Sequence, residues 1–245
     1  MTRWVCGLSY DGTGFCGWQI QPPGATSKPA LQNVVEAALA RIAGHPVATR
    51  CAGRTDAGVH ALQQVIQFDT EADRSPHAWV RGVNRWLPPG VAVLWAVRVD
   101  EAFDARFSAT ARTYWYAILD TPVRPPLWRE RAGWYHQPLD PQRMLESAAC
   151  LLGSHDFSAF RASECQAASP VRTIESIDIV RDGGFLLLSI TANAFLHHMV
   201  RNLVGGLVYV ADGRRLDGGG AVLAQPQLRR ADLQRLRALP RVGPL

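Results

Sequence analysis

The sequence predicts an α+β protein of two similar subdomains, each an antiparallel sheet with helices packed on one face, with a basic cleft between them. Patterns of alternating strands and amphipathic helices are interleaved in both halves of the chain, with glycine- and proline-rich turns between them. A chain of 245 residues with 47% hydrophobic content can also bury a full core in one or two domains. We place the subdomains at residues 1–105 and 106–245.

The first half is predicted to run strand, helix, strand, strand, helix, strand. Apolar residues recur at helical spacing from Leu31 to Ile42, so one stripe of that helix should lie on a sheet. Ser75 and Pro76 are typical of an N-cap and first turn, and they open the second helix. The predicted elements are a strand over 3–9, a turn at Asp11, Gly12 and Gly14, a helix from about Pro29, strands over 47–51 and 65–68, a helix from Ser75 to Pro88, and a strand over 91–99.

The second half is expected to repeat this alternation of sheet and packed helix. In the stretch 103–119, alternation places Arg112 and Tyr114 on the same face of a strand. Asp140 and Pro141 open another helix. The remaining predicted elements are a hairpin of strands 172–180 and 185–191 around Asp182, Gly183 and Gly184, and a well-buried helix over 193–210.

The charge balance permits an anionic partner without demanding one, since the net charge is +5 and the pI is about 9.2. Lys28 is the only lysine, so nearly all of the 26 basic residues are arginines. Guanidinium groups bind phosphate bidentately and stack on bases. A GC-rich coding sequence would give the same excess of arginine, so both explanations stay open.

No apolar run reaches the roughly 18 to 20 residues of a membrane span, so we expect no membrane association and a cytoplasmic location. The five cysteines are widely spaced and form no CxxC pair, so neither a disulfide framework nor a zinc site is predicted. Cys51 could be a nucleophile, but a small apolar core residue at a strand end is the favoured interpretation.

Asp56 is the leading candidate for chemistry. It lies in the motif GRTDAG at 53–58, where a strand ends, and Gly53 and Gly58 free the backbone so that its carboxylate can be presented in a cleft. Arg54 lies beside it. The alternative is an Asx-type turn, in which the carboxylate only binds nearby amides.

Arg201 is the second candidate, because an ionised side chain within an apolar helix must face a partner or a wet cleft. A structural ion pair is the alternative. If Arg201 pairs with Asp56, the guanidinium would keep the carboxylate ionised and oriented. His197 and His198 are interpreted as core or rim residues, because adjacent helical positions diverge by about 100° and no third metal ligand is evident.

Tyr114 is the third candidate, since an aromatic ring with a polar tip can stack on a base or bind a polar substrate. A core role is the usual one for an aromatic residue in a strand. The chain has no Walker loop, GxGxxG, HExxH, GxSxG or CxxC motif. These absences leave a site that uses no cofactor and that rests on one carboxylate.

Five motifs occur in a recognisable order: YDGTGFCGWQ at 10–19, GRTDAGVHA at 53–61, FDARFSATARTYWY at 103–116, DFSAF at 156–160 and NAFLHHMVRNLVG at 193–205. Together they closely resemble the TruA family of tRNA pseudouridine synthases over residues 3–210. The resemblance implies a cofactor-free and metal-free isomerase that converts uridine to pseudouridine at positions 38, 39 and 40 of the tRNA anticodon arm. It also implies a homodimer that binds tRNA in basic clefts.

Carried over to this chain, the resemblance makes Asp56 the catalytic aspartate and Arg201 its ion-pair partner. It makes Tyr114 the aromatic residue against the target uracil, and Arg54 the arginine that fills the place of the flipped-out base. The tail from about residue 212 departs from the family pattern, since no aromatic residue follows Tyr209 where such proteins have a final strand that walls the uracil pocket. A frameshifted or truncated tail is our hypothesis, and a catalytically impaired RNA-binding or RNA-chaperone module is the alternative function.

Overall fold

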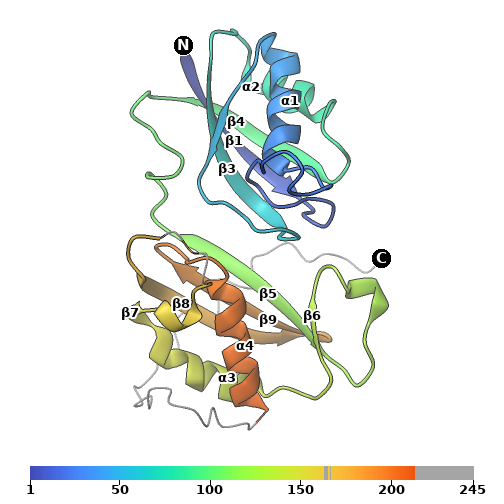
Figure 1. Cartoon of the computed structure of the whole chain (residues 1–245), viewed down its shortest axis with the longest axis vertical. Helices are drawn as coiled ribbons and strands as arrows, with labels where there is room; N and C mark the ends of the chain where they lie inside the picture. Colours follow the sequence, from blue (N-terminus) through green and yellow to red (C-terminus); the bar gives the residue numbers. More distant parts are fainter. Residues whose placement is uncertain (163–164, 166, 213–245) are drawn as a thin grey trace. The chain divides into compact units, whose positions relative to one another are not determined.

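The structure is a computed structural model that describes residues 1–162, 165 and 167–212 (Figure 1). The atypical tail lies outside the described residues. The described residues form two compact units, the first of Met1–Arg112 with Pro126–Arg131 and the second of Thr113–Pro125 with the described residues from Ala132 to Asp212. Each unit has its own hydrophobic core and is described by itself.

The first unit contains a four-stranded antiparallel sheet in the order β2-β3-β1-β4. Its strands are β1 (Thr2–Tyr10), β2 (Thr49–Cys51), β3 (Ala61–Thr70) and β4 (Val91–Val99). Strand β1 is central, and alternate side chains of β1 from Trp4 to Tyr10 are buried in the core. This alternation is the period-two pattern expected of a strand with one face on a core.

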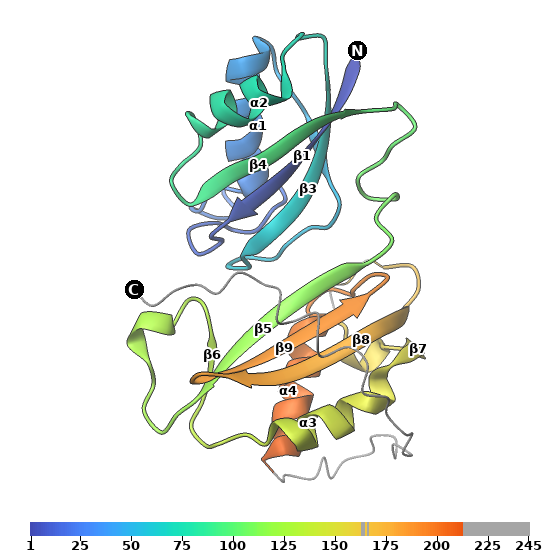
Figure 2. The same cartoon turned by 180° about the vertical axis from the view of Figure 1, so that it is seen from behind.

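Two helices cover one face of this sheet, α1 (Leu31–Ala43) and α2 (Pro76–Asn84) (Figure 2). The predicted start of α2 is confirmed, because the Ser75 side chain accepts a hydrogen bond from the Ala78 amide and Pro76 occupies the first turn. The Trp79 ring of α2 packs against Trp4 and Phe68 of the sheet, with ring centroids 5.9 and 5.0 Å away.

The second unit contains a five-stranded sheet in the order β6-β5-β9-β8-β7. The predicted hairpin is confirmed as β8 (Val171–Asp182) and β9 (Phe185–Ala192), which pair antiparallel. Next to it lies β5 (Arg112–Asp120). The two short edge strands are β6 (Gly133–Tyr135) and β7 (Gly153–Asp156).

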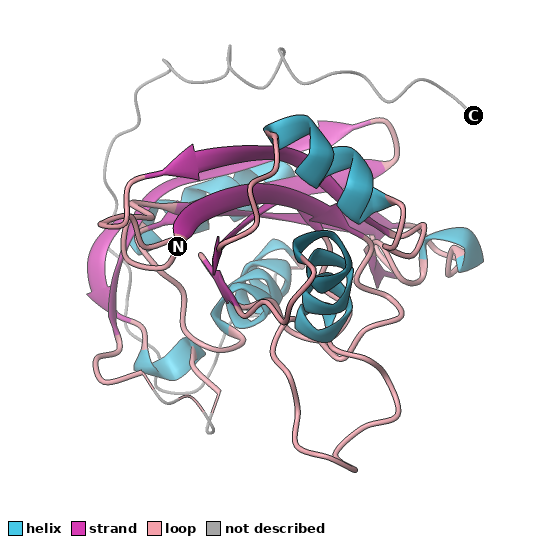
Figure 3. Cartoon of the chain, turned by 90° about the horizontal axis from the view of Figure 1, so that it is seen from above, coloured by secondary structure: helices cyan, strands magenta, loops and turns pink. Residues whose placement is uncertain are grey.

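The second sheet is not purely antiparallel, which corrects the prediction in one detail. Strand β6 pairs parallel to β5, with Ile118 opposite Gly133. Parallel neighbours need a connection of roughly a dozen residues, and the segment from Thr121 to Ala132, which includes the 3-10 turn η1 (Pro126–Trp128), supplies one. Figure 3 distinguishes the helices from the strands by colour. The two sheets with their helices confirm the predicted α+β class.

Helices α3 (Pro141–Ala148) and α4 (Met199–Ala211) pack on the second sheet. Asp140 caps α3 as predicted, its side chain accepting from the amides of Gln142 and Arg143. Two 3-10 turns complete this unit, η2 (Ala149–Leu151) and η3 (Ser158–Phe160). Across the described residues, no helix combines the length and apolar character needed to cross a bilayer.

Candidate functional site

Asp56 and Arg54 lie on the loop between β2 and β3, where the sequence places them. The amide of Val59 donates to the carbonyl of Asp56 at 3.1 Å, which closes a tight turn. Gly58 adopts φ +76°, a left-handed conformation that residues other than glycine rarely reach. The Arg54 side chain is exposed and Asp56 is half-buried, so the turn presents both side chains at the surface of the first unit.

This loop is held by the segment that follows β1. The Trp18 amide donates to the Thr55 carbonyl at 2.9 Å, and the hydroxyls of Tyr10 and Thr55 lie 2.8 Å apart. Tyr10 and Trp18 are themselves buried in the core. Thr55, the residue immediately before Asp56, is therefore fixed on both its backbone and its side chain by groups that cannot move without disturbing the core.

Two glycines allow the segment after β1 to lie close against the loop of Asp56. A Cβ at Gly12 would overlap the Val59 carbonyl oxygen, and a Cβ at Gly17 would lie 2.7 Å from the Thr55 oxygen. Gly17 also has φ +102°. Any larger residue at either position would push the two loops apart.

A buried amide completes the support from the sheet side. Gln64 is 7% exposed, and its Nε2 atom donates to the Gly53 carbonyl and, at 3.3 Å, to the Tyr10 hydroxyl. Sequence reasoning did not identify this role, because a glutamine in a strand pattern carries no local signal of the partner it will meet.

Asp11 forms a second polar centre beside the loop. Its Oδ1 accepts from the Thr13 amide at 3.0 Å and from the Thr13 hydroxyl at 2.6 Å, and its Oδ2 lies 3.1 Å from Nη2 of Arg131. These bonds to Thr13, together with Arg131 and His60, lower the pKa of Asp11 to about 2. Asp11 is therefore ionised at neutral pH.

His60, at the end of the loop, joins this centre. Its Nδ1 accepts from the Gly12 amide at 3.2 Å and lies 3.1 Å from Oδ1 of Asp11. Its Nε2 lies 2.9 Å from the Glu130 carbonyl, so Nε2 carries the proton when the ring is neutral. The imidazole thus links the loop of Asp56 to the turn after β1 and to segment 126–131.

Cys51 has the properties of a structural residue, as interpreted from the sequence. Burial raises the pKa of its thiol to about 11, although Arg54 and Arg106 oppose the rise. A protonated thiol is a poor nucleophile, so this side chain is inert at neutral pH.

Tyr114 belongs to the second unit. It lies on β5 and packs edge-on against Phe195, with ring centroids 5.0 Å apart and an interplanar angle of 84°. The residue is half-buried. The contact with Phe195 therefore holds the Tyr114 ring in one orientation.

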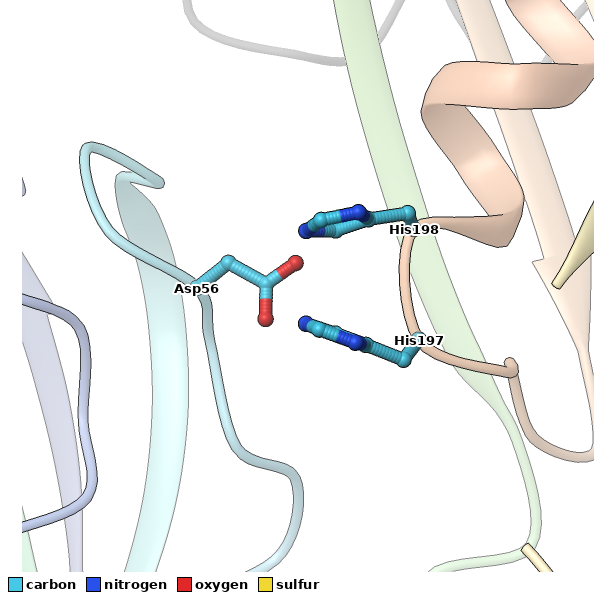
Figure 4. Close-up of side chains that lie close together, drawn as sticks. All are labelled: Asp56, His197 and His198. Carbon is cyan, nitrogen blue, oxygen red and sulfur yellow. The ribbon is translucent and has the colours of Figure 1, made fainter. Parts of the chain in front are cut away.

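The predicted helix over 193–210 begins later than expected. Helix α4 starts at Met199, and its N-cap His198 has φ 61°, the only positive φ of a non-glycine residue among the described residues. Buried Leu196 keeps the apolar spacing but lies before the helix. The argument that His197 and His198 diverge as helical neighbours is therefore wrong: their rings lie side by side, with centroids 3.9 Å apart and an interplanar angle of 35° (Figure 4).

Arg201 lies in the first turn of α4 and is exposed. One stripe of α4 is buried, and Arg201 lies outside that stripe, as expected of an ionised side chain in an apolar helix. A cation near a helix N-terminus opposes the helix dipole, so its position there is not explained by helix stability. Its predicted pairing with Asp56 joins residues of different units and stays a prediction.

A metal site within one unit has no support from the described residues. Taken alone, neither unit contains three described His, Cys, Asp or Glu side chains close enough to share an ion. Figure 4 shows the carboxylate and imidazole groups of the candidate residues, with Asp56 on the loop after β2 and the two histidines on the segment before α4.

The comparisons with known proteins agree with the motifs. A family model described as tRNA pseudouridine synthase matches residues 8–108 and 148–240. A protein of Methylobacillus flagellatus named tRNA pseudouridine synthase A is 55% identical over 212 residues, which cover 86% of this chain and 80% of the relative. Proteins of the same name from Burkholderia multivorans and Methylibium petroleiphilum are 57% and 54% identical, covering 86% and 94% of this chain and 77% and 87% of the relatives. The resemblance read from the five motifs is thus confirmed, and the chain belongs to the tRNA pseudouridine synthase family.

Proposed function

We propose that this chain isomerises uridine to pseudouridine at positions 38, 39 and 40 in the anticodon arm of tRNA. The observation that supports it most strongly is that the family match spans the loop of Asp56, with relatives above 50% identity that are named tRNA pseudouridine synthase A. We expect the enzyme to act in the cytoplasm, as a homodimer, without a metal or cofactor.

The reaction needs no external reagent. The bond between N1 of uracil and C1′ of the ribose breaks, the uracil turns in place, and a bond forms between C5 and C1′. C5 then loses its proton and N1 gains one, so the proton count is unchanged. Because the product is an isomer of the substrate, no electrons leave or enter. The requirement is a carboxylate at the reacting centre, together with a site that holds the detached base and excludes water.

Asp56 supplies the carboxylate in this proposal, as nucleophile toward the sugar or base or as the base that removes the C2′ proton. The bonds that fix Thr55 support this role, because they hold the neighbouring residue in one position. Arg201 is assigned as its ion-pair partner, which would keep it ionised.

Arg54 and Tyr114 are assigned to the step in which the target uridine leaves its stack. Moving a stacked uridine into a site costs a few kcal/mol, and a side chain that fills the gap offsets part of this cost. Arg54, whose guanidinium is exposed beside Asp56, is assigned to the gap. Tyr114 is assigned to stacking against the target uracil.

The test is base-resolution mapping of pseudouridine in tRNA incubated with the purified chain. Asp56→Asn keeps the size of the side chain and removes its charge, so turnover should fall at least about a hundredfold while tRNA binding persists. Asp73→Asn changes a carboxylate in the same unit that is 95% exposed, and it should leave turnover unchanged.

Three results would count against the proposal. Full activity of Asp56→Asn would refute the role of that residue. Pseudouridine at other positions would refute the assigned substrate site. Binding of tRNA by the unaltered chain with no turnover would instead support the RNA-binding alternative.

A further inference from the structure

Phe107 is an unusual residue of the first unit because its ring is 76% exposed on the segment between β4 and β5. Single exposed apolar side chains are common and need no explanation by themselves. What distinguishes Phe107 is the rigid turn that carries it and the charge around it.

The turn is closed by the side chain of Asp104. Its Oδ1 accepts from the amides of Arg106 and Phe107 at 2.9 and 3.0 Å, and the Ser108 amide donates to the Asp104 carbonyl at 2.7 Å. The other carboxylate oxygen pairs with Arg50. The backbone at Phe107 is therefore ordered before any partner arrives, which lowers the entropy cost of binding there.

The turn is also anchored to the sheet and to the loop of Asp56. Ala105 is buried, and its amide donates to Oε1 of Gln67 on β3. Nη2 of Arg112 donates to the carbonyls of Arg106 and Ala52, each at 2.9 Å. Ala52 directly precedes the GRTD motif, so one guanidinium joins the turn of Phe107 to the start of the catalytic loop.

The charge beside the ring is positive. The Arg106 guanidinium lies 5.4 Å from the ring centroid of Phe107, and Arg106 and Arg54 are both exposed. Both cations lie close enough to the partly buried thiol of Cys51 to lower its pKa, which places both near the start of the loop. The nearby Asp104 is already paired with Arg50.

We propose that Phe107 is a stacking surface for an unpaired nucleobase next to the target uridine, and that Arg106 contacts the adjoining phosphate. This inference rests on the proposed function. A flat apolar ring beside exposed positive charge fits a base and its phosphate, because every base has a π-face and carries an anionic link. An apolar protein partner would gain little from the arginines.

The test compares Phe107→Ala, Phe107→Leu and Phe107→Trp in binding to an anticodon stem–loop RNA and in single-turnover conversion. Loss of one base stack should raise Kd about five- to a hundredfold in the alanine and leucine variants, and the tryptophan variant should retain affinity. The melting temperature should not change, because the ring is exposed. Trp86→Ala is the matched control, since Trp86 is 52% exposed, lies under Arg41 at 5.1 Å and is in the same unit.

The outcomes separate this inference from the proposed function. If the unaltered chain makes pseudouridine and Phe107→Ala binds RNA equally well, the stacking role is refuted and the function stands. If the chain binds RNA in a Phe107-dependent way without turnover, the stacking role stands and the function fails. Full affinity of Phe107→Leu would refute stacking in favour of a nonspecific apolar contact.

Discussion

Asp11 is the residue at which three segments of the first unit meet. Its carboxylate binds Thr13, pairs with Arg131 and lies beside His60, which ends the loop of Asp56. The pKa of Asp11 is lowered to about 2, chiefly by the hydrogen bonds from Thr13. Because the unfolded chain has an ordinary aspartate pKa near 3.9, the charged form stabilises the fold above about pH 4.

Asp11→Asn should therefore lower stability at neutral pH by about 1 kcal/mol, a modest value because the side chain is 35% exposed and solvent screens its pairing. The deficit relative to the unaltered chain should shrink as pH falls from 4 toward 2, where the wild-type carboxylate becomes protonated. Thermal melts at a series of pH values measure this difference. Asp73→Asn should show almost no deficit at any pH, and a deficit of Asp11→Asn that is constant with pH would contradict the assignment.

Sequence reasoning singled out residues with a local signal and missed those whose partners are distant. Asp56 was singled out because glycines flank it in one short motif, and Arg54 received its role from the family resemblance; both assignments stay predictions. The links from Asp11 to Arg131 and from His60 to Glu130 span 120 and 70 positions. No periodicity or spacing encodes such pairs, since they depend on how two loops fold onto one sheet.

The turn after β1 and the loop between β2 and β3 act together as one support for Asp56. Gly12 and Gly17 let the two segments touch, and the hydroxyl pair of Tyr10 and Thr55 fixes their register. The position of the Asp56 carboxylate thus depends on residues that precede it by some forty positions and that, in our proposal, never contact the substrate.

Gly12→Ala should reduce both stability and turnover. The new methyl group would overlap the Val59 carbonyl, a backbone atom that can yield only by displacing the loop of Asp56. Overpacking of this kind costs about 1–3 kcal/mol of the free energy of unfolding. Chemical denaturation and single-turnover assays measure the two effects.

Gly14→Ala is the matched control, because a methyl group at this position would meet no atom within 4 Å and Gly14 does not have a positive φ. Gly14→Ala should leave the free energy of unfolding and the turnover rate close to those of the unaltered chain. Equal behaviour of the two variants would show that close approach at Gly12 does not position the loop.

Helices with capping residues were predicted well, and short or locally irregular elements were not. Ser75 with Pro76, and Asp140 with Pro141, set the starts of α2 and α3. The start of α4 was misplaced because apolar spacing continues through Leu196, while the left-handed His198 interrupts the helix. Strands β6 and β7 have only three and four residues, too few for alternation to be seen.

At the scale of the whole molecule, the polypeptide chain crosses from one unit to the other three times. The crossings follow Arg112, Pro125 and Arg131. The alternation of strand and helix patterns predicted two α+β units, but no pattern in the sequence indicated that segment 126–131 would leave the second half and join the first. Its attachment through Arg131 and Asp11 is a tertiary contact.

The charge of the whole molecule gives the last prediction. A net charge of +5, carried almost entirely by arginine, should make tRNA binding strongly dependent on salt, because each phosphate that is neutralised releases a counterion. Affinity measured by fluorescence anisotropy should fall at least about tenfold between roughly 50 and 200 mM salt.

Arg106→Ala should reduce the slope of log Kd against log salt by about one, whereas Phe107→Ala should weaken binding with the slope unchanged. An unchanged slope in Arg106→Ala would exclude its phosphate contact, and a salt-independent affinity of the unaltered chain would mean that its arginines do not bind the RNA backbone.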